Sequence, residues 1–188
     1  MSKDRMPPLA AEELDAEQQK AADAFTASRG IAPFGPFVPL LRSPEVMTRA
    51  AALGEYLRYR NALPKRLSEL AILIAARVWT QQFEWHHHRR FALEAGLDAK
   101  LIGELAEGRR PAQLAEDEAV VYDFAMELHR NRSVSDTTYA KALAALGEKG
   151  IIDLVGIAGY YGLLAMAMNV ARTPLPPGIE PALPVMPH

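Results

Sequence analysis

Acidic and imidazole side chains gather in one short stretch, Glu84 to Gly96, which reads EWHHHRRFALEAG. Placed on a helix with about 100° between successive residues, Phe91 and Ala92 fall on an apolar arc that also contains Glu84 and His88. Side chains four positions apart on a helix are in contact. Because burying an unpaired charge is costly, two inward-facing titratable groups need a partner or a shifted pKa. The pattern therefore predicts that Glu84 and His88 form a buried proton-transfer pair.

The three consecutive histidines do not predict a metal site. Successive helical residues point about 100° apart, so His86, His87 and His88 cannot converge on one ion. We expect His86 to face solvent or a neighbouring subunit, and His87 to lie at the border of the apolar arc. Glu84 and His87 form one E-x-x-H, but a di-iron bundle needs two such pairs and two further glutamates, and no second E-x-x-H is present. We expect neither a metal nor a cofactor.

Composition excludes several classes of function. The 188 residues suit a single domain, and a net charge of −2, with 21 basic and 23 acidic residues, gives no field for nucleic acid or an anionic membrane. The absence of cysteine removes disulfides, zinc-thiolate sites and thiol chemistry. The first residues, MSKDRMPPLA, lack the apolar core of a signal peptide, so a cytoplasmic location is expected.

Apolar periodicity and capping residues predict an all-α bundle of about seven to eight helices, with no strand pattern. The most apolar run, Leu154–Met168, is shorter than the roughly 20 residues that span a bilayer and is expected to be a buried core helix. Glycines 156, 159 and 162 in that helix predict the tightest helix crossing of the fold. Helices are expected at about 11–28, 44–60, 64–80, 84–95, 98–106, 116–131, 135–147 and 149–171, with a kink or short break over 80–83.

Two segments are expected to be extended. The stretch GIAPFGPFVP interleaves prolines and glycines with Phe34 and Phe37, which predicts an ordered, non-helical loop whose aromatic rings pack against something. The tail PLPPGIEPALPVMPH holds six prolines, and we expect it to strap onto a neighbouring subunit.

The chain from Leu63 to Leu105 resembles the core of the carboxymuconolactone decarboxylase family, within the alkyl hydroperoxidase D-like superfamily. The family signature is a leucine-rich helix with an internal Glu, followed by Glu-Trp-x-x-His-x-x-x-Ala-x-x-Ala-Gly-Leu. The resemblance implies a single-domain, oligomeric helical bundle, with an N-terminal extension over 1–62, a core over 63–172 and a tail over 173–188. The matching positions are Glu69, Glu84, Trp85, His88, Ala92, Ala95, Gly96 and Leu97, and the later helix with Asp153, Tyr160 and Asn169 is similar to the last helix of the family.

The same resemblance implies a cofactor-free enzyme that decarboxylates a small carboxylated lactone or a related organic acid, and a trimer or hexamer. By analogy, His88 would be the acid or proton shuttle, Glu84 its partner and Glu69 a second relay member. Arg77, chosen because it is near in sequence, or a charged group from another subunit would hold the substrate anion. Trp85 and Gln81 would contact the substrate, with core packing as the alternative for Trp85.

Other interpretations stay open. A relative, alkyl hydroperoxidase D, uses a C-x-x-C-x-x-x-H motif whose cysteines would fall at Gln81 and Glu84, so thiol peroxidase activity is excluded. The chain could instead be a non-catalytic helical oligomer that binds a small molecule. Glu84 and His88 would then be a structural pair at the kink, and Glu69 would accept hydrogen bonds from the break at 80–83.

Overall fold

The computed structural model describes residues 4–185, and these residues form eight α-helices, one short 3₁₀ helix and no strand, which confirms the all-α prediction. The elements are η1 (Ala11–Glu13), α1 (Ala16–Arg29), α2 (Phe37–Leu40), α3 (Pro44–Tyr59), α4 (Lys65–Val78), α5 (Gln82–Glu94), α6 (Ala99–Ala106), α7 (Glu116–Asn131) and α8 (Asp136–Ala171).

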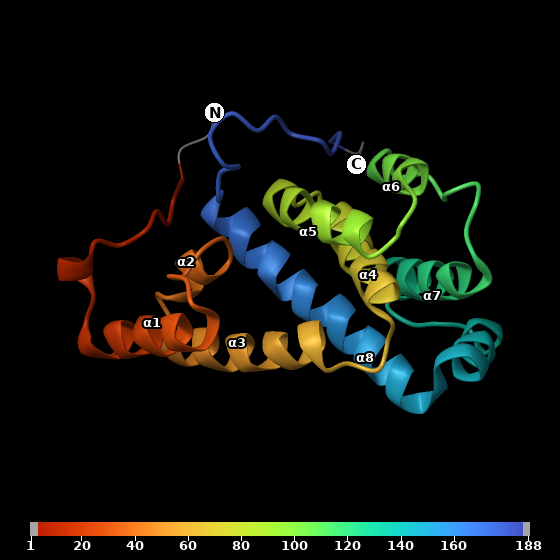
Figure 1. Ribbon diagram of the computed structural model, residues 1–188, viewed down its shortest axis with the longest axis horizontal. Helices are drawn as coiled ribbons and strands as arrows, with labels where there is room; N and C mark the ends of the chain where they lie inside the picture. Colours follow the sequence, from red (N-terminus) through yellow and green to blue (C-terminus); the bar gives the residue numbers. More distant parts are fainter. Residues whose placement is uncertain (1–3, 186–188) are drawn as a thin grey trace.

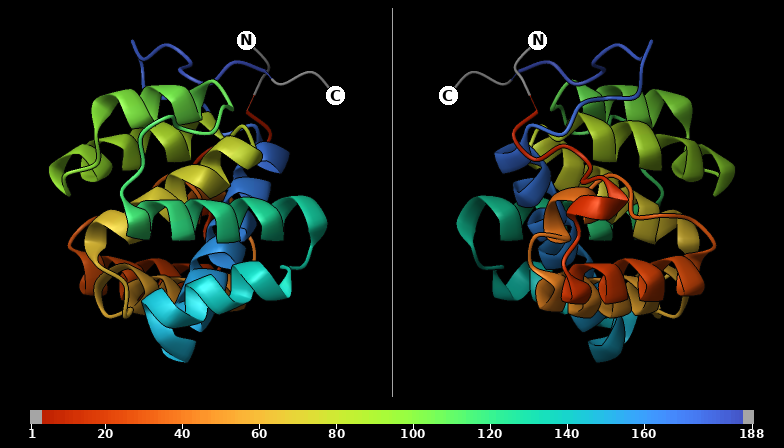
Figure 2. Two further views of the ribbon diagram at one scale, coloured as in Figure 1. Left: turned by 90° about the vertical axis from the view of Figure 1, so that its right-hand side faces the viewer. Right: turned by 90° about the vertical axis from the view of Figure 1, so that its left-hand side faces the viewer.

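Helix α8 runs diagonally through the molecule, and α3, α4 and α7 pack against it (Figure 1). Helices α5 and α6 lie at one end of the bundle, while α1, α3 and the start of α8 lie at the other (Figure 2). Every residue of α4 from Leu67 to Arg77 is buried, so α4 is central to the bundle. Helix α5 packs along α4 and completes the framework that holds Glu69, Glu84 and His88.

Helix α8 is two helical segments joined at Gly147, whose φ of 67° and ψ of 172° are not helical. This is the boundary expected at that glycine. By length and composition α8 is apolar enough to span a membrane, with a mean hydropathy of 1.7 over 18 residues, but 61% of that window is buried inside the protein. The apolar run therefore packs as a core helix.

The glycine row of α8 meets its neighbours at two of three positions. A Cβ at Gly156 would lie 3.0 Å from Leu57 Cδ2, and one at Gly162 would lie 3.2 Å from Trp79 Nε1. Nothing lies within 4 Å of the corresponding position at Gly159. Side chains therefore pack closely on Gly156 and Gly162 but not on Gly159. A Cβ at Gly54 of α3 would come closer still to a neighbour, the Tyr160 hydroxyl. That the glycine row of α8 forms the tightest helix crossing stays a prediction.

The segment with Phe34 and Phe37 is only partly the extended loop that we expected. Residues 37–40 form the short helix α2, although Pro39 lies within it. Proline is tolerated in the first turn of a helix, where its missing N–H has no intrahelical partner to lose. The Phe37 ring packs against Phe25 of α1 at a centroid distance of 4.5 Å, and Phe34 lies 6.4 Å from both rings, so the expected aromatic packing is confirmed.

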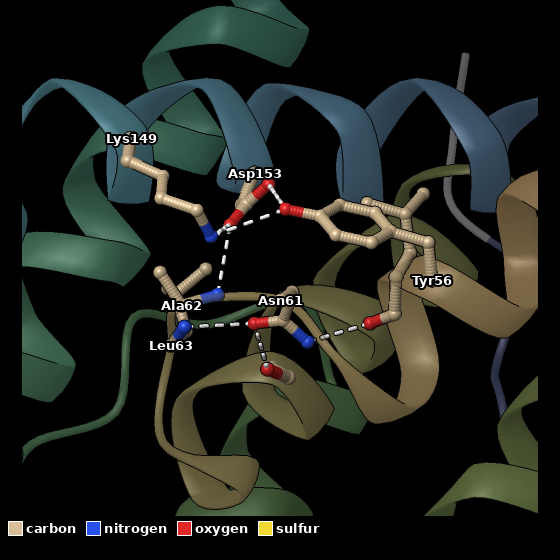
Figure 3. Close-up of polar contacts among 8 residues, drawn as sticks. Tyr56, Asn61, Ala62, Leu63, Lys149 and Asp153 are labelled. Atoms are coloured by element: carbon tan, nitrogen blue, oxygen red, sulfur yellow. Dashed lines mark hydrogen bonds and ion pairs between the residues drawn. The ribbon is translucent and has the colours of Figure 1, made fainter.

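Asp153 of α8 fixes the turn between α3 and α4 (Figure 3). Its carboxylate accepts hydrogen bonds from the Ala62 amide at 2.7 Å, the Tyr56 hydroxyl at 2.9 Å and the Lys149 ammonium at 3.2 Å. Burial opposes ionisation of Asp153, but these three donors together outweigh it and lower its pKa. The contact thereby holds α3 and α8 together on one side of the bundle.

The proline-rich tail packs on its own chain. Gln82, at the start of α5, accepts hydrogen bonds from the amides of Ala182 and Leu183 and donates one to the Leu183 carbonyl. The Leu183 side chain is only 3% exposed and joins the core. Residues 182–183 therefore contact α5 of the same chain, whereas we expected the tail on a neighbouring subunit.

Candidate functional site

A break between α4 and α5 orients the candidate residues. Thr80 adopts a left-handed φ of 47°, and Gln81 then caps α5, its side-chain oxygen accepting hydrogen bonds from the amides of Phe83 at 2.7 Å and Glu84 at 3.1 Å. The expected interruption over 80–83 is therefore confirmed. Because α5 starts there and packs back along α4, Glu84 and His88 turn into the interior.

His88 pairs with Glu69, not with Glu84. His88 Nδ1 lies 2.8 Å from Glu69 Oε2, and both side chains are buried. The predicted Glu84–His88 pair is therefore wrong, as is the idea that Glu69 accepts hydrogen bonds from the break at 80–83. Glu69 of α4 lies directly beside the His88 imidazole. Its carboxylate is hydrogen-bonded to Nδ1, and this contact takes the place of the one that we expected with Glu84.

Glu84 is buried with both carboxyl oxygens lacking a hydrogen-bond partner among the residues that the structure describes. Glu84 is only 3% exposed. Burial raises the pKa of Glu84 well above its usual value, because desolvation penalises the carboxylate form. The environment thus favours a protonated Glu84, which can donate a proton.

The His88 imidazole responds to burial in the opposite sense. Desolvation lowers its pKa, although the hydrogen bond and the charge of Glu69 oppose the change. With Glu69 accepting the Nδ1 hydrogen, the assigned tautomer leaves Nε2 as an acceptor, and no other hydrogen-bond partner of this ring lies within residues 4–185. A proton donor and a proton acceptor therefore stand four residues apart on α5.

Both side chains line one half-open cavity of about 40 Å³. A cavity needs roughly 10–15 Å³ to hold one water molecule, so this one holds only a few. Tyr160 and Tyr161 of α8 form another wall, and the edge-on ring of Tyr161 lies 5.0 Å from that of His88. The remaining lining residues are Arg29, Phe34, Pro36, Phe37, Gly54, Arg58, Phe83, His87, Leu164 and Met168.

Burial keeps two further groups of the cavity neutral. It lowers the pKa of His87 to about 3, with the charges of His88, Arg58 and nearby cations adding to the shift. It also raises the pKa of Tyr160 to about 12. At neutral pH the phenol of Tyr160 is a hydrogen-bond donor, and His87 is uncharged.

The three residues expected to contact the substrate lie elsewhere. Arg77 is buried at the end of α4, where Nε and Nη2 have no described partner and burial lowers its pKa. Trp85 is 1% exposed in the core, and Gln81 is the α5 cap, whose amide donates to Asn169 Oδ1 at 3.1 Å. None of the three lines the cavity.

Sequence reasoning missed the cationic and aromatic residues of the site. Arg29 and Arg58 lie on α1 and α3, and both line the cavity. Their positions carry no local motif, and only the packing of α1 and α3 on the core brings them near α5. Tyr161 was also missed, but it did carry a sequence signal, because it belongs to a pair of tyrosines inside an apolar run.

The histidine run does not form a metal centre with its neighbours. Within residues 4–185, no three His, Asp or Glu side chains lie close enough together to hold a metal ion. His86 is exposed, whereas His88 is buried against Glu69.

Comparison with known proteins supports the resemblance seen in the sequence. Residues 44–125, from α3 through most of α7, match the model of the Carboxymuconolactone decarboxylase family. This match is longer than the stretch on which the resemblance was based. No curated protein matches the chain.

Solved structures with little sequence identity share the fold. The debrominase Bmp8 without ligand has a TM-score of 0.69 and 13% identity, with 92% of each chain covered. A variant of Bmp8 in complex with 2,3,4-tribromopyrrole has the same TM-score and identity and covers 92% of this chain and 91% of its own. ATU0492 from Agrobacterium tumefaciens, a protein of unknown function described as a putative antioxidant defence protein AhpD, has a TM-score of 0.65 and 18% identity. The match covers 73% of this chain and 94% of its own.

The family match supports an enzyme-like function at the level of the family, and the solved structures show the shared fold. The helical arrangement described above is the alkyl hydroperoxidase D-like fold that ATU0492 also has. The sequence contains no cysteine, so this is a cysteine-free chain whose residues 44–125 match the Carboxymuconolactone decarboxylase family.

Proposed function

We propose that the protein is a cofactor-free lyase that decarboxylates a small carboxylated lactone or a related organic acid. The observation that carries the proposal is that Glu84 and His88 share one cavity while burial moves their pKa values in opposite directions. Pairs of titratable groups whose environments separate their pKa values are a mark of acid and base roles. The family match supports the reaction class.

The chemistry follows from these two roles. The bond between the substrate carbon and its carboxylate breaks, carbon dioxide leaves, and the electron pair remains on a carbon conjugated with the lactone carbonyl. Glu84 donates its proton to that carbon, which forms the new C–H bond. His88 Nε2 then takes up a proton from solvent and passes it to the Glu84 carboxylate, so both groups return to their starting protonation states. Glu69 acts as a positioning residue, because it fixes the imidazole tautomer through Nδ1.

The largely apolar lining of the cavity supports the same reaction. A carboxylate that enters a site with little water loses hydration, and loss of carbon dioxide removes that charge. Aromatic rings of Phe34, Phe83 and Tyr161 contribute to the lining. The cost of taking the substrate out of water thus falls as the carbon–carbon bond breaks.

Turnover of a panel of carboxylated lactones, β-keto acids and unsaturated acids tests the proposal, with carbon dioxide release and solvent-deuterium incorporation as readouts. We expect Glu84→Gln and His88→Asn to lower kcat by about 10²-fold or more, the usual scale of a lost general acid or base. The matched control is His86→Asn, which alters an exposed imidazole of the same helix and should keep wild-type activity.

Glu69→Gln separates positioning from chemistry. It should lower kcat less than His88→Asn and shift the pH profile, because it alters the pKa of His88 without removing the imidazole. Circular dichroism and melting temperature establish that each variant folds. Absence of turnover by the wild-type protein across the panel, together with ligand binding, would support the alternative, a non-catalytic small-molecule-binding oligomer.

A further inference from the structure

The wall of the cavity that faces α5 is built by residues that precede Pro64. Gly35 has a φ of 53°, and a Cβ there would lie 2.5 Å from Phe83 Cε1, so only glycine lets this loop close on α5. Gly54 of α3 leaves room for the Tyr160 hydroxyl in the same way. The segment before the core is therefore fitted closely to the site.

Two guanidinium groups on this wall have no acidic partner. Within residues 4–185, no carboxylate lies at ion-pair distance from Arg29 or Arg58, and Glu84 makes no hydrogen bond to either. Arg29 is held in place by the Ala51 carbonyl at 3.0 Å and by the Phe25 ring at 5.0 Å. Arg58 has only ring contacts, with its guanidinium 4.5 Å from the Phe91 centroid. Arg58 is therefore free to bind an anion.

Further cations surround the same ring. Lys65 and Arg90 lie 5.6 Å and 4.6 Å from the Phe91 centroid, and of the three cations only Arg90 has an acid nearby, Glu94 at 3.8 Å. Cations gathered around one ring repel one another, and a bound anion would offset that repulsion. The surroundings of Arg58 are thus electropositive and favour approach of a negatively charged ligand.

Aromatic rings line the cavity on both the α5 side and the opposite wall. The rings of Phe83 and His87 are stacked, with 8° between their planes and 6.3 Å between their centroids. The Phe34 ring lies 5.6 Å from His87 and is half-buried. Planar, conjugated groups pack favourably against such faces.

We propose that Arg58, assisted by Arg29, binds the carboxylate of a planar, unsaturated organic acid whose conjugated part lies against Phe34 and Phe83. The inference rests on the proposed function, since it names the carboxylate-binding residues and the substrate class of that same site. The cavity of about 40 Å³ is half-open, so the acid has a path into it from solvent.

Calorimetric binding of benzoate and of sorbate, each compared with its neutral amide, tests this proposal without requiring turnover. We expect both acids to bind more tightly than their amides. Arg58→Gln should weaken acid binding by about tenfold or more, the scale of a lost hydrogen bond to a charged group, and leave amide binding unchanged. Arg58→Lys should restore part of the loss.

Arg60→Gln is the matched control, because Arg60 has the same charge at the end of the same helix but is exposed, pairs with Glu55 at 3.2 Å and does not line the cavity. It should change acid binding less than twofold. Equal binding of acids and amides, no binding of either acid, or equal losses in Arg58→Gln and Arg60→Gln would overturn the proposal. If the protein binds the acids through Arg58 but turns over no substrate, only the proposed function is contradicted. If the protein is active and Arg58→Gln leaves turnover unchanged, only this inference is contradicted.

Discussion

Glu84 carries the clearest conflict between stability and chemistry at the scale of single residues. Both of its carboxyl oxygens are buried without a partner. Leaving a buried polar group unsatisfied costs about 1–3 kcal/mol, and proteins retain such groups where function requires them. The same burial raises the pKa of Glu84 and favours its protonated form, so its cost to stability and its proposed role have one cause.

Replacing Glu84 with Gln should change how stability depends on pH. The pKa of Glu84 is raised in the folded state, so between the unfolded pKa of about 4.3 and the folded pKa the unfolded chain is ionised while the folded protein keeps its proton. Wild-type stability then falls with rising pH by up to about 1.4 kcal/mol per pH unit, and Glu84→Gln removes this loss. Urea unfolding of both proteins from pH 4 to pH 9 measures the difference. If the difference in the free energy of unfolding between wild type and Glu84→Gln stays constant from pH 4 to pH 9, Glu84 is ionised in the folded protein.

The sequence located the buried acid and imidazole but assigned the wrong partner. Spacing along one helix correctly turned Glu84 and His88 inward, because helical periodicity is local. It could not show that Glu69 of α4 lies 2.8 Å from His88. Arg58 escaped notice for a similar reason, since the lack of an acidic partner is visible only once α3 packs on the core.

Among the elements, helix boundaries were predictable wherever the signal is a cap. Asp98 accepts hydrogen bonds from the first amides of α6, and Ser135 accepts one from the first turn of α8. Gly96 and Gly147 have the positive φ values that end helices. Helix α2 was not predicted, because its single turn is stabilised by aromatic packing with α1 and not by propensity.

The contact between α8 and the turn that joins α3 to α4 should contribute measurably to stability. Asp153→Asn weakens hydrogen bonds from Ala62, Tyr56 and Lys149 to a charged acceptor, which should cost on the order of 1–3 kcal/mol. Since the pKa of Asp153 is lowered by folding, this contribution is present above about pH 4 and is lost as pH falls through the folded pKa.

Urea unfolding at pH 7 and at pH 3 measures this contribution. The difference in the free energy of unfolding between wild type and Asp153→Asn should be smaller at pH 3 than at pH 7. Asp123→Asn is the control, because Asp123 makes an exposed ion pair with Arg110, a kind of contact that contributes about 1 kcal/mol or less. Equal effects of the two substitutions would contradict a special role for Asp153.

At the scale of the whole molecule, α8 leaves an apolar stripe uncovered. Ile152 and Val170 are 67% and 57% exposed, at the two ends of a row that follows helical spacing. Between them Gly159 faces open space, so another backbone could approach closely there. The other members of the stripe are Val155, Leu163 and Met166. A run of exposed large apolar residues along one helix face marks an interaction surface more often than a solvated one.

We propose that this stripe joins copies of the chain into a homo-oligomer, as the family resemblance implies. Light scattering coupled to size-exclusion chromatography should give the wild-type protein a mass above the 20.7 kDa of one chain. Ile152→Asp combined with Met166→Asp places two charges on the stripe, and burying unpaired charges in an apolar contact is costly, so the double variant should dissociate to 20.7 kDa. Val46→Asp, which alters an exposed apolar residue of α3 outside the stripe, should leave the assembly intact. A monomeric wild type at micromolar concentration would contradict the proposal. Because no residue of the stripe lines the cavity, that result would not affect the proposed acid and base roles of Glu84 and His88.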